Sequence, residues 1–452
     1  MIKLALQKII DGELPLDFNW NSDQHIAAPL PHVIPADPSA SQMKKIVLVG
    51  EDLRDGLHGI TEYPALPIMM GYVQMMSELG IHNITVGIYT GEKNKINETI
   101  LSLLTQIYEK YPHMVPIILT LASEPAIAWA SECKKYNPNV NAIVFMGTAP
   151  SRLLVEEWQK EYILDRLKWA VHEATYTHHI DVIGATEHTT QTPPDFLRDI
   201  IITVVKNGAK FFCIADTIGI ARPIGVARII RFTQKVLKDI GATHVMIDWH
   251  GHDDLGNGVA NAMTAIAMGV NRVHTVARGI GERAGNTRME AILLNGAEIL
   301  KEQEQEIPWN LQNIHKVLSK YDELTKNPTP THGPLGKRAF STSLGIHTSA
   351  MLKAELLARS AKEQNLGKIS RKLEVMARKI YTALDPTELG RNHEIRVGPW
   401  SGKSTVYLAY LALGNDPKTL SEKDIEQILF TAKRLGRELT NEELKKLLNN
   451  NK

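Results

Sequence analysis

Strand-like and helix-like segments alternate eight times along this chain, and this alternation restricts the fold more than any other feature. The expected strands are short apolar runs at 46–49, 84–89, 116–121, 142–146, 181–185, 211–215, 245–249 and 272–277. Segments with helical periodicity lie between them, for example at 63–79, 97–110, 153–172, 195–206, 223–237 and 258–268. Eight successive βα units predict an α/β fold, a (β/α)8 TIM barrel, whose active-site groups follow the carboxyl ends of the strands.

The segments flanking these units indicate four parts. Residues 1–40 contain five prolines and are expected to form an extended N-terminal arm. The catalytic barrel is expected at 41–305, and the proline-rich stretch near 326–334 marks a linker at 306–340. From 341 to 452 the pattern is mainly helical, with capping residues at Ser421 and Thr440, and predicts a helical accessory region.

Composition favours a large enzyme that acts on small polar molecules. The 51 Lys and Arg nearly balance the 50 Asp and Glu, which argues against nucleic acid and anionic membranes as partners. Only Cys133 and Cys213 are present, so a disulfide framework is not expected and a reducing compartment fits. The chain has no apolar run long enough to span a membrane and no recognisable signal peptide, so we expect a cytoplasmic protein.

A His-Gly-His motif at residues 250–252 ends the seventh expected strand. Residues two apart on a strand point to the same side, so His250 and His252 can reach one ion. Neutral imidazole binds divalent transition metals well, and a carboxylate is needed to complete such a site. Asp55, directly after the first strand, would lie on the same rim of a closed barrel. Arg54 beside it could stabilise negative charge developing on a carbonyl oxygen.

Four motifs in this order resemble one enzyme family. They are Arg54-Asp55-Gly56, Asp216-Thr217-Ile218-Gly219, the His-Gly-His motif, and the glycine-rich segment Gly-Ile-Gly-Glu-Arg-Ala-Gly-Asn at 279–286. Together they resemble the metal-dependent family of isopropylmalate, homocitrate and citramalate synthases and hydroxymethylglutaryl-CoA lyase, over about residues 44–405.

The resemblance implies roles for individual residues. The implied ligands of a divalent metal (Zn, Mn, Mg or Co) are Asp55, His250 and His252, with Asn286 completing or supporting the shell. Arg54 would polarise the ketone of a 2-oxo acid. Thr217, Glu282 and His58 are expected to contact the substrates, Thr217 at the 2-oxo acid carboxylate and Glu282 near the thioester of acetyl-CoA, the co-substrate.

The C-terminal part of the resemblance favours a synthase over a lyase. Gly345-Ile346-His347, Tyr381 and residues 385–390 are similar to the accessory region of the synthases, whose His and Tyr reach over the active site of the neighbouring subunit. A homodimer is therefore implied. The lyases carry a reactive cysteine in the glycine-rich loop, and residues 279–286 contain none.

The implied reaction joins acetyl-CoA, a 2-oxo acid and water to give a 2-hydroxy (alkyl)malate and CoA. We expect 2-isopropylmalate synthase activity, which belongs to leucine biosynthesis, with citramalate, homocitrate or Re-type citrate synthesis as alternatives. A lyase, a non-haem iron oxygenase and a non-catalytic binding barrel also stay open. The candidate bases are His347 with Tyr381, and Glu187. Departures from the family pattern, such as Leu57, Ala185 and Asp253, leave the substrate undecided.

Overall fold

The computed structural model describes residues 20, 37–91, 94–415 and 419–449. Most of the N-terminal arm expected at residues 1–40 lies outside these ranges. The chain divides into two compact units, which we call the barrel unit (Met1–Asn310 and Lys316–Asn327) and the accessory unit (Leu311–His315 and Pro328–Lys452). Helix α12 (Ile314–Thr325) falls in the segment expected as a linker, and from Lys316 onward it belongs to the barrel unit.

Eight parallel strands close into a barrel in sequence order, and β1 pairs with both β2 and β8. The strands are β1 (Val47–Gly50), β2 (Asn83–Ile88), β3 (Val115–Leu121), β4 (Asn141–Gly147), β5 (Asp181–Glu187), β6 (Phe211–Asp216), β7 (Met246–Gly251) and β8 (Arg272–Thr275). The predicted TIM barrel is confirmed. Strand β7 continues two residues past its predicted end, so His250 lies within the strand and His252 directly after it.

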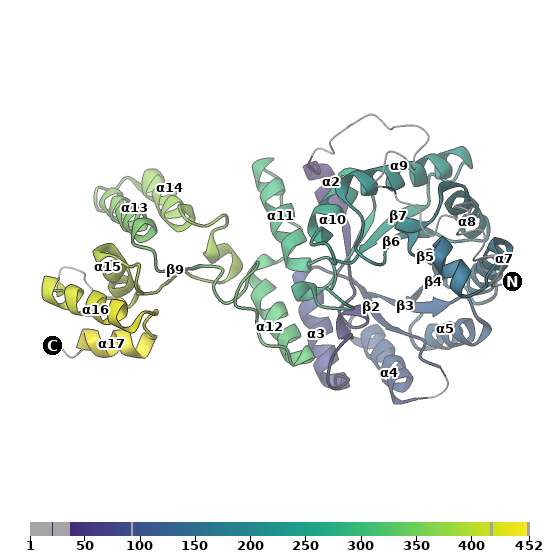
Figure 1. The fold of residues 1–452 in the computed structure, drawn as a ribbon, viewed down its shortest axis with the longest axis horizontal. Coiled ribbons are helices and arrows are strands. Elements are labelled where there is room, and N and C mark those ends of the chain that lie inside the picture. Colours follow the sequence, from purple (N-terminus) through teal and green to yellow (C-terminus); the bar gives the residue numbers. More distant parts are fainter. Residues whose placement is uncertain (1–19, 21–36, 92–93, 416–418, 450–452) are drawn as a thin grey trace. The chain divides into compact units, whose positions relative to one another are not determined.

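Helices connect the strands and surround the barrel (Figure 1). They are α3 (Leu66–Leu79), α4 (Lys95–Lys110), α5 (Glu124–Tyr136), α6 (Pro150–Val155), α7 (Lys160–His172), α8 (Pro194–Lys206), α9 (Pro223–Asp239), α10 (Gly258–Ala267) and α11 (Met289–Glu302), with α2 (Ala40–Lys45) before β1. Several have proline at their first or second position, where its fixed φ suits the first helical turn. The single helix predicted at 153–172 is wrong, because Glu157 adopts a left-handed backbone that separates α6 from α7.

The barrel interior has an apolar part and a charged part. Buried aliphatic and aromatic residues from β1, β3, β4, β5 and β6 form one cluster, which includes Val49, Ile117, Ile183 and Phe211. Strands β7 and β8 instead contribute buried charged side chains, among them Asp248 and Arg272. The core thus leaves a polar column beneath the rim where β1, β7 and β8 end.

The accessory unit is mainly helical, as predicted. Its helices are α13 (Gly345–Glu363), α14 (Gly367–Lys379), α15 (Lys403–Ala412), α16 (Glu422–Leu435) and α17 (Asn441–Asn449), and β9 (Ser341–Thr342) pairs with β10 (Glu394–Ile395). The expected capping boxes are present at Ser421 and Thr440. Residues of α15, α16 and α17, including Val406, Ile428 and Leu444, share one apolar core.

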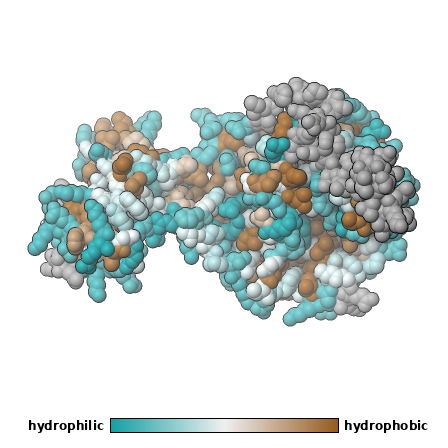
Figure 2. Space-filling view, viewed as in Figure 1, coloured by the Kyte–Doolittle hydropathy of each residue, from teal (hydrophilic) through white to brown (hydrophobic). Residues whose placement is uncertain are grey.

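Helices α13 and α14 expose several large apolar side chains. Ile346 is 75% exposed, and Leu356, Leu357 and Ile369 are each more than half exposed. Hydrophobic residues accordingly reach the surface of this unit among hydrophilic ones in Figure 2. Large exposed apolar side chains that gather in one patch often mark interaction surfaces.

Both cysteines, Cys133 and Cys213, are buried and free, as the sequence led us to expect. Among the helices of the described residues, none combines the length and apolarity needed to cross a bilayer.

Candidate metal centre

Asp55, His250 and His252 come together at the carboxyl end of the barrel. Asp55 begins the short 3-10 turn η2 (Asp55–Leu57) after β1, and the histidines lie at the end of β7. The Nε2 atoms of His250 and His252 are 3.3 Å apart, and Nε2 of His252 is 3.9 Å from Oδ2 of Asp55. One potential ligand atom from each residue lies within 4.8 Å of the others. The three residues predicted from the sequence are therefore close enough to hold one ion.

The protonation states of this trio suit a divalent cation. Burial, with the neighbouring His252, lowers the pKa of His250 to about 3, and burial also lowers the pKa of His252. Nδ1 of His252 lies 3.1 Å from the carbonyl oxygen of Gly285, so it donates there and leaves the Nε2 lone pair free. Burial opposes ionisation of Asp55, but Arg54 and His58 hold the pKa of its carboxyl well below the ordinary range. Two neutral imidazoles and one carboxylate are a ligand set that divalent transition metals accept.

The glycine-rich loop at 279–286 holds the Asp55 carboxylate. Asn286 Nδ2 donates to Oδ1 of Asp55 at 2.7 Å, and the backbone NH of Glu282 donates to the same oxygen at 3.2 Å. Gly281 has φ +147°, and a Cβ there would meet Asn286 Nδ2 at 2.1 Å and Asp55 Oδ1 at 2.6 Å. Only glycine permits this close approach. In this geometry Asn286 supports the carboxylate through its amide nitrogen.

Arg54 lies between two carboxylates at the edge of the site. Its Nη1 is 2.7 Å from Oδ2 of Asp55, and its Nε and Nη2 are 3.0 and 2.9 Å from Oε2 of Glu51. A guanidinium has five N–H groups, so these contacts leave two for a substrate. The side chain remains 13% exposed, and its orientation is set by both acids.

A buried row of charged residues beneath the site was missed by the sequence analysis. Glu51 Oε1 is 2.7 Å from Nδ1 of His274 on β8, and Nε2 of His274 is 3.5 Å from Asp248. Asp248 in turn accepts two hydrogen bonds from Arg272, at 2.8 and 2.5 Å. Burial opposes protonation of His274, but its hydrogen bonds to the two carboxylates raise its pKa. The alternation of Arg272 and His274 with apolar neighbours along β8 is the signal that would have placed both on the inner face.

His58 and Glu282, predicted to contact substrate, lie beside the trio. His58 Nδ1 is 3.2 Å from Oε2 of Glu282 and 3.7 Å from Oδ1 of Asp55, and both His58 and Glu282 are well exposed. The Asp55 carboxylate beside it raises the pKa of His58. A polar pair at this position can meet a ligand that enters from solvent.

Thr217 and Glu187 occupy other parts of the barrel unit. The Thr217 hydroxyl accepts a hydrogen bond from the backbone NH of His188 at 2.8 Å, and its carbonyl accepts from Arg283 Nη2 at 2.5 Å. Glu187 ends β5, is 35% exposed and lies 3.8 Å from Nε of Arg152. These contacts fix where the two side chains lie in the absence of substrate.

His347 and Tyr381 belong to the accessory unit. Their rings stack with centroids 4.0 Å apart and planes 21° from parallel. The two residues named as a candidate base are therefore adjacent within the unit.

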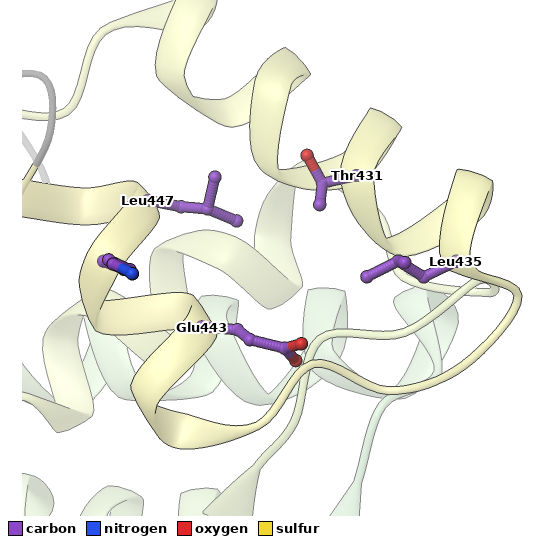
Figure 3. A pocket seen from close by; sticks show the side chains of 5 residues that line it. Thr431, Leu435, Glu443 and Leu447 are labelled. Carbon is purple, nitrogen blue, oxygen red and sulfur yellow. The ribbon is translucent and has the colours of Figure 1, made fainter.

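A small open pocket of about 180 Å³ lies between α16 and α17 (Figure 3). Its lining residues are Thr431, Leu435, Glu443, Lys446 and Leu447. None of them is a site residue predicted from the sequence. The lining of this pocket includes no histidine pair and no arginine like those at the barrel rim.

Comparisons with known proteins agree with the fold and the motifs. The HMGL-like family model matches residues 45–320, more than half of the chain. The chain is 25% identical over 400 residues to the 2-isopropylmalate synthase of Tolumonas auensis, covering 85% of this chain and 72% of that protein. It is 26% identical over 397 residues to the 2-isopropylmalate synthase of Sulfurisphaera tokodaii, covering 87% of this chain and 91% of that protein.

Two further proteins extend this comparison. The homocitrate synthase AksA of Methanopyrus kandleri is 24% identical over 399 residues, covering 87% of this chain and 88% of that protein. Among solved structures, the HMG-CoA lyase from Brucella melitensis has a TM-score of 0.50 at 15% identity, over 62% of this chain and 99% of that chain. The structural likeness concerns the barrel fold, whereas the sequence likeness to the synthases continues past the barrel into the accessory unit.

Proposed function

The chain belongs to the HMGL-like family, and from this premise we propose that it catalyses a Claisen-type condensation of acetyl-CoA with a 2-oxo acid. The enolate of acetyl-CoA would attack the ketone, and hydrolysis of the thioester would release CoA and a 2-hydroxy (alkyl)malate. The observation that carries the proposal is the joint position of Arg54, Asp55, His250 and His252 on one rim. Likeness to named synthases over 85–87% of the chain supports it.

We propose 2-oxoisovalerate as the first substrate to test, which would make the enzyme a 2-isopropylmalate synthase of leucine biosynthesis. Two of the compared relatives carry that name. The homocitrate synthase relative keeps 2-oxoglutarate as a second candidate. Pyruvate and oxaloacetate, which would give citramalate and citrate, complete the range. Two buried free cysteines suit a reducing compartment, and we propose a cytoplasmic location.

In this proposal Asp55, His250 and His252 would hold a divalent cation (Zn, Mn, Mg or Co), with Asn286 supporting the carboxylate. Such a cation, when bound, draws electron density from a carbonyl oxygen. Arg54 would also stabilise negative charge on the ketone oxygen, because its two remaining N–H groups can donate to this oxygen as it becomes an alkoxide. Loss of one such donor typically costs about 10²–10³ in rate.

The other rim residues would bind and orient the two substrates. The Thr217 hydroxyl accepts from a backbone NH, so its own O–H can donate to the carboxylate of the 2-oxo acid. Glu282 and His58 are the exposed pair next to Asp55 and are candidates for contact with acetyl-CoA. These proposed roles rest on which hydrogen bonds each of the three side chains can still donate or accept at the barrel rim.

Two candidates for the base that removes a methyl proton from acetyl-CoA remain. Glu187 stands at the carboxyl end of β5, on the rim where active sites of this fold lie. His347 with the stacked Tyr381 is the alternative, supplied by the accessory unit of a second copy of the chain in a homodimer. The exposed apolar side chains of α13 and α14 support such an assembly.

Release of CoA from acetyl-CoA tests the reaction. Free thiol should appear with one of 2-oxoisovalerate, 2-oxoglutarate, pyruvate or oxaloacetate after the protein is loaded with Mn²⁺. The Asp55→Asn variant, which keeps the side-chain shape and removes the charge, is the matched control. Thiol release no faster than in this control with all four acids would reject the proposal. It would favour instead a non-catalytic binding barrel, a lyase or an iron oxygenase.

Subunit mixing tests the origin of the base. Arg54→Ala and His347→Ala should each be inactive, and hybrid dimers formed by refolding them together should regain part of the activity. One of the two sites in such a hybrid would have both residues intact. If subunits exchange and no activity returns, His347 acts within its own subunit. A His347→Ala variant that keeps its activity would instead favour Glu187 as the base.

A further inference from the structure

Two adjacent residues of α12, Tyr321 and Asp322, are buried against the barrel rim. The sequence analysis placed this segment in a linker. Each of the two nevertheless bonds to a different loop of the site. Their contacts explain how a helix after the eighth strand can influence the metal centre.

Tyr321 holds the turn that carries Asp55. Its hydroxyl donates to the carbonyl oxygen of Gly56 at 2.8 Å, within η2. The fit is tight, because a Cβ on Gly56 would lie 2.1 Å from the Tyr321 hydroxyl oxygen and 2.9 Å from Val276 Cγ1. A side chain at position 56 would collide with the tyrosine hydroxyl, so the glycine next to Asp55 permits this hydrogen bond.

Asp322 holds Arg278, the residue directly before the glycine-rich loop. Its two carboxylate oxygens accept from Nε and Nη2 of Arg278, at 3.0 and 2.8 Å, in a buried bidentate pair. Arg278 has φ +63°, a left-handed conformation that is unfavourable for a residue with a side chain. The ion pair, with a hydrogen bond from the Arg278 NH to Glu290, holds the backbone in that conformation.

The two loops meet at Asp55. The carbonyl oxygen of Gly279, next to Arg278, accepts the backbone NH of Asn286 at 3.0 Å, and Asn286 Nδ2 then donates to Asp55 Oδ1 at 2.7 Å. On the other side, Gly56 follows Asp55 directly in the turn held by Tyr321. One helix thus restrains both the backbone that carries the carboxylate and the amide that orients it.

We infer that Tyr321 and Asp322 are positioning residues that tie the turn at Asp55 and the glycine-rich loop to α12, and so set the Asp55 carboxylate against the histidine pair for cation binding. The inference rests on the proposed function, because it takes the trio of Asp55, His250 and His252 as the cation site. Partners that orient a ligand commonly contribute about 10–100-fold to metal affinity.

Titration of the metal-free full-length protein with Mn²⁺, followed by calorimetry, tests the inference without an activity measurement. Tyr321→Phe removes one oxygen atom from a fully buried ring, and we expect it to weaken Mn²⁺ binding about tenfold. Asp322→Asn should weaken it at least as much. Because that variant leaves Arg278 partly unpaired and can fail to fold, Asp322→Glu is made as well and should recover affinity. Excess Mn²⁺ should restore thiol release by Tyr321→Phe toward the wild-type rate.

Tyr72→Phe is the matched control. Tyr72 is equally buried and packs against Tyr321 with ring centroids 5.3 Å apart, but its hydroxyl does not bond to Gly56. It should bind Mn²⁺ like the wild type. Equal affinities for wild type, Tyr321→Phe and Tyr72→Phe would overturn the inference, and so would equal weakening by both tyrosine variants. If the wild type binds no Mn²⁺, the proposed cation site itself fails.

Discussion

We expect the buried side chain of Glu290, at the start of α11, to lower the free energy of unfolding of the protein as the pH rises from acidic to neutral. The side chain is fully buried, and burial raises its pKa from the ordinary 4.5 to about 7. Its Oε2 accepts from the NH of Arg278 at 3.0 Å, and among the described residues Oε1 has no hydrogen-bond partner. Nε of Arg288 is 3.9 Å from Oε1, too far for a hydrogen bond. The fold therefore favours the neutral acid.

The sign and size of the effect follow from this difference in pKa. A carboxyl with a raised pKa in the folded state contributes stability that is fully present below pH 4.5 and is lost as the pH rises through 7. The difference between pKa 4.5 and 7 corresponds to about 3 kcal/mol. Glu290→Gln keeps an oxygen to accept from Arg278 and cannot ionise. Relative to wild type, the variant should gain about 3 kcal/mol in free energy of unfolding between about pH 4.5 and pH 8.

Urea unfolding followed by far-UV circular dichroism at several pH values would measure this gain. The comparison at acidic pH gives the fixed difference between glutamine and the protonated acid, and only the change with pH tests the reasoning. Glu302→Gln, an exposed position on the same helix, is the control and should show no comparable change. A difference between Glu290→Gln and wild type that stays constant over this range would refute the argument.

Three further predictions concern the site. Glu51 is as buried as Glu290, and its carboxylate pairs with both Arg54 and His274. Glu51→Gln leaves these cations without that partner, so urea unfolding should show a free energy of unfolding about 3–5 kcal/mol lower than in the wild type. His252→Ala should abolish thiol release and sharply weaken Mn²⁺ binding while far-UV circular dichroism stays native; unchanged metal stoichiometry would contradict the assignment. Gly281→Ala should weaken Mn²⁺ binding in the same titration because its Cβ would displace Asn286, whereas Gly59→Ala, at a positive φ with open space around it, should bind normally.

The opposite behaviour expected of Glu51 and Glu290 illustrates where sequence reasoning ends. Both are buried glutamates in the barrel unit. The pKa of Glu51 is lowered, because Arg54 and His274 together outweigh the effect of burial, and the pKa of Glu290 is raised by burial. His274 is 223 residues from Glu51 in the chain. No local pattern tells the two acids apart, since the pairing depends on β8 closing against β1.

The sequence by itself determined the barrel and most of the candidate site. Hydrophobic periodicity is a local property, so it predicted all eight strands to within two residues. The rule that active-site groups follow the strands then brought Asp55 into reach of His250 and His252, as the structure has them. The limits of local patterns appear at 153–172, where a left-handed residue that no periodicity marks divides the expected helix.

Only the tertiary structure decided how the site is held in place. The segment carrying α12 looked like a linker because its proline-rich end dominates the pattern, yet Tyr321 and Asp322 reach Gly56 and Arg278. These partners are 265 and 44 residues away in the chain. The alternation along β8 could have placed Arg272 and His274 on the inner face, but it could not have named their partners Asp248 and Glu51, which lie on β7 and directly after β1. Hydrogen bonds and ion pairs of this kind depend on distances across the closed barrel, and spacing along the chain carries no record of them.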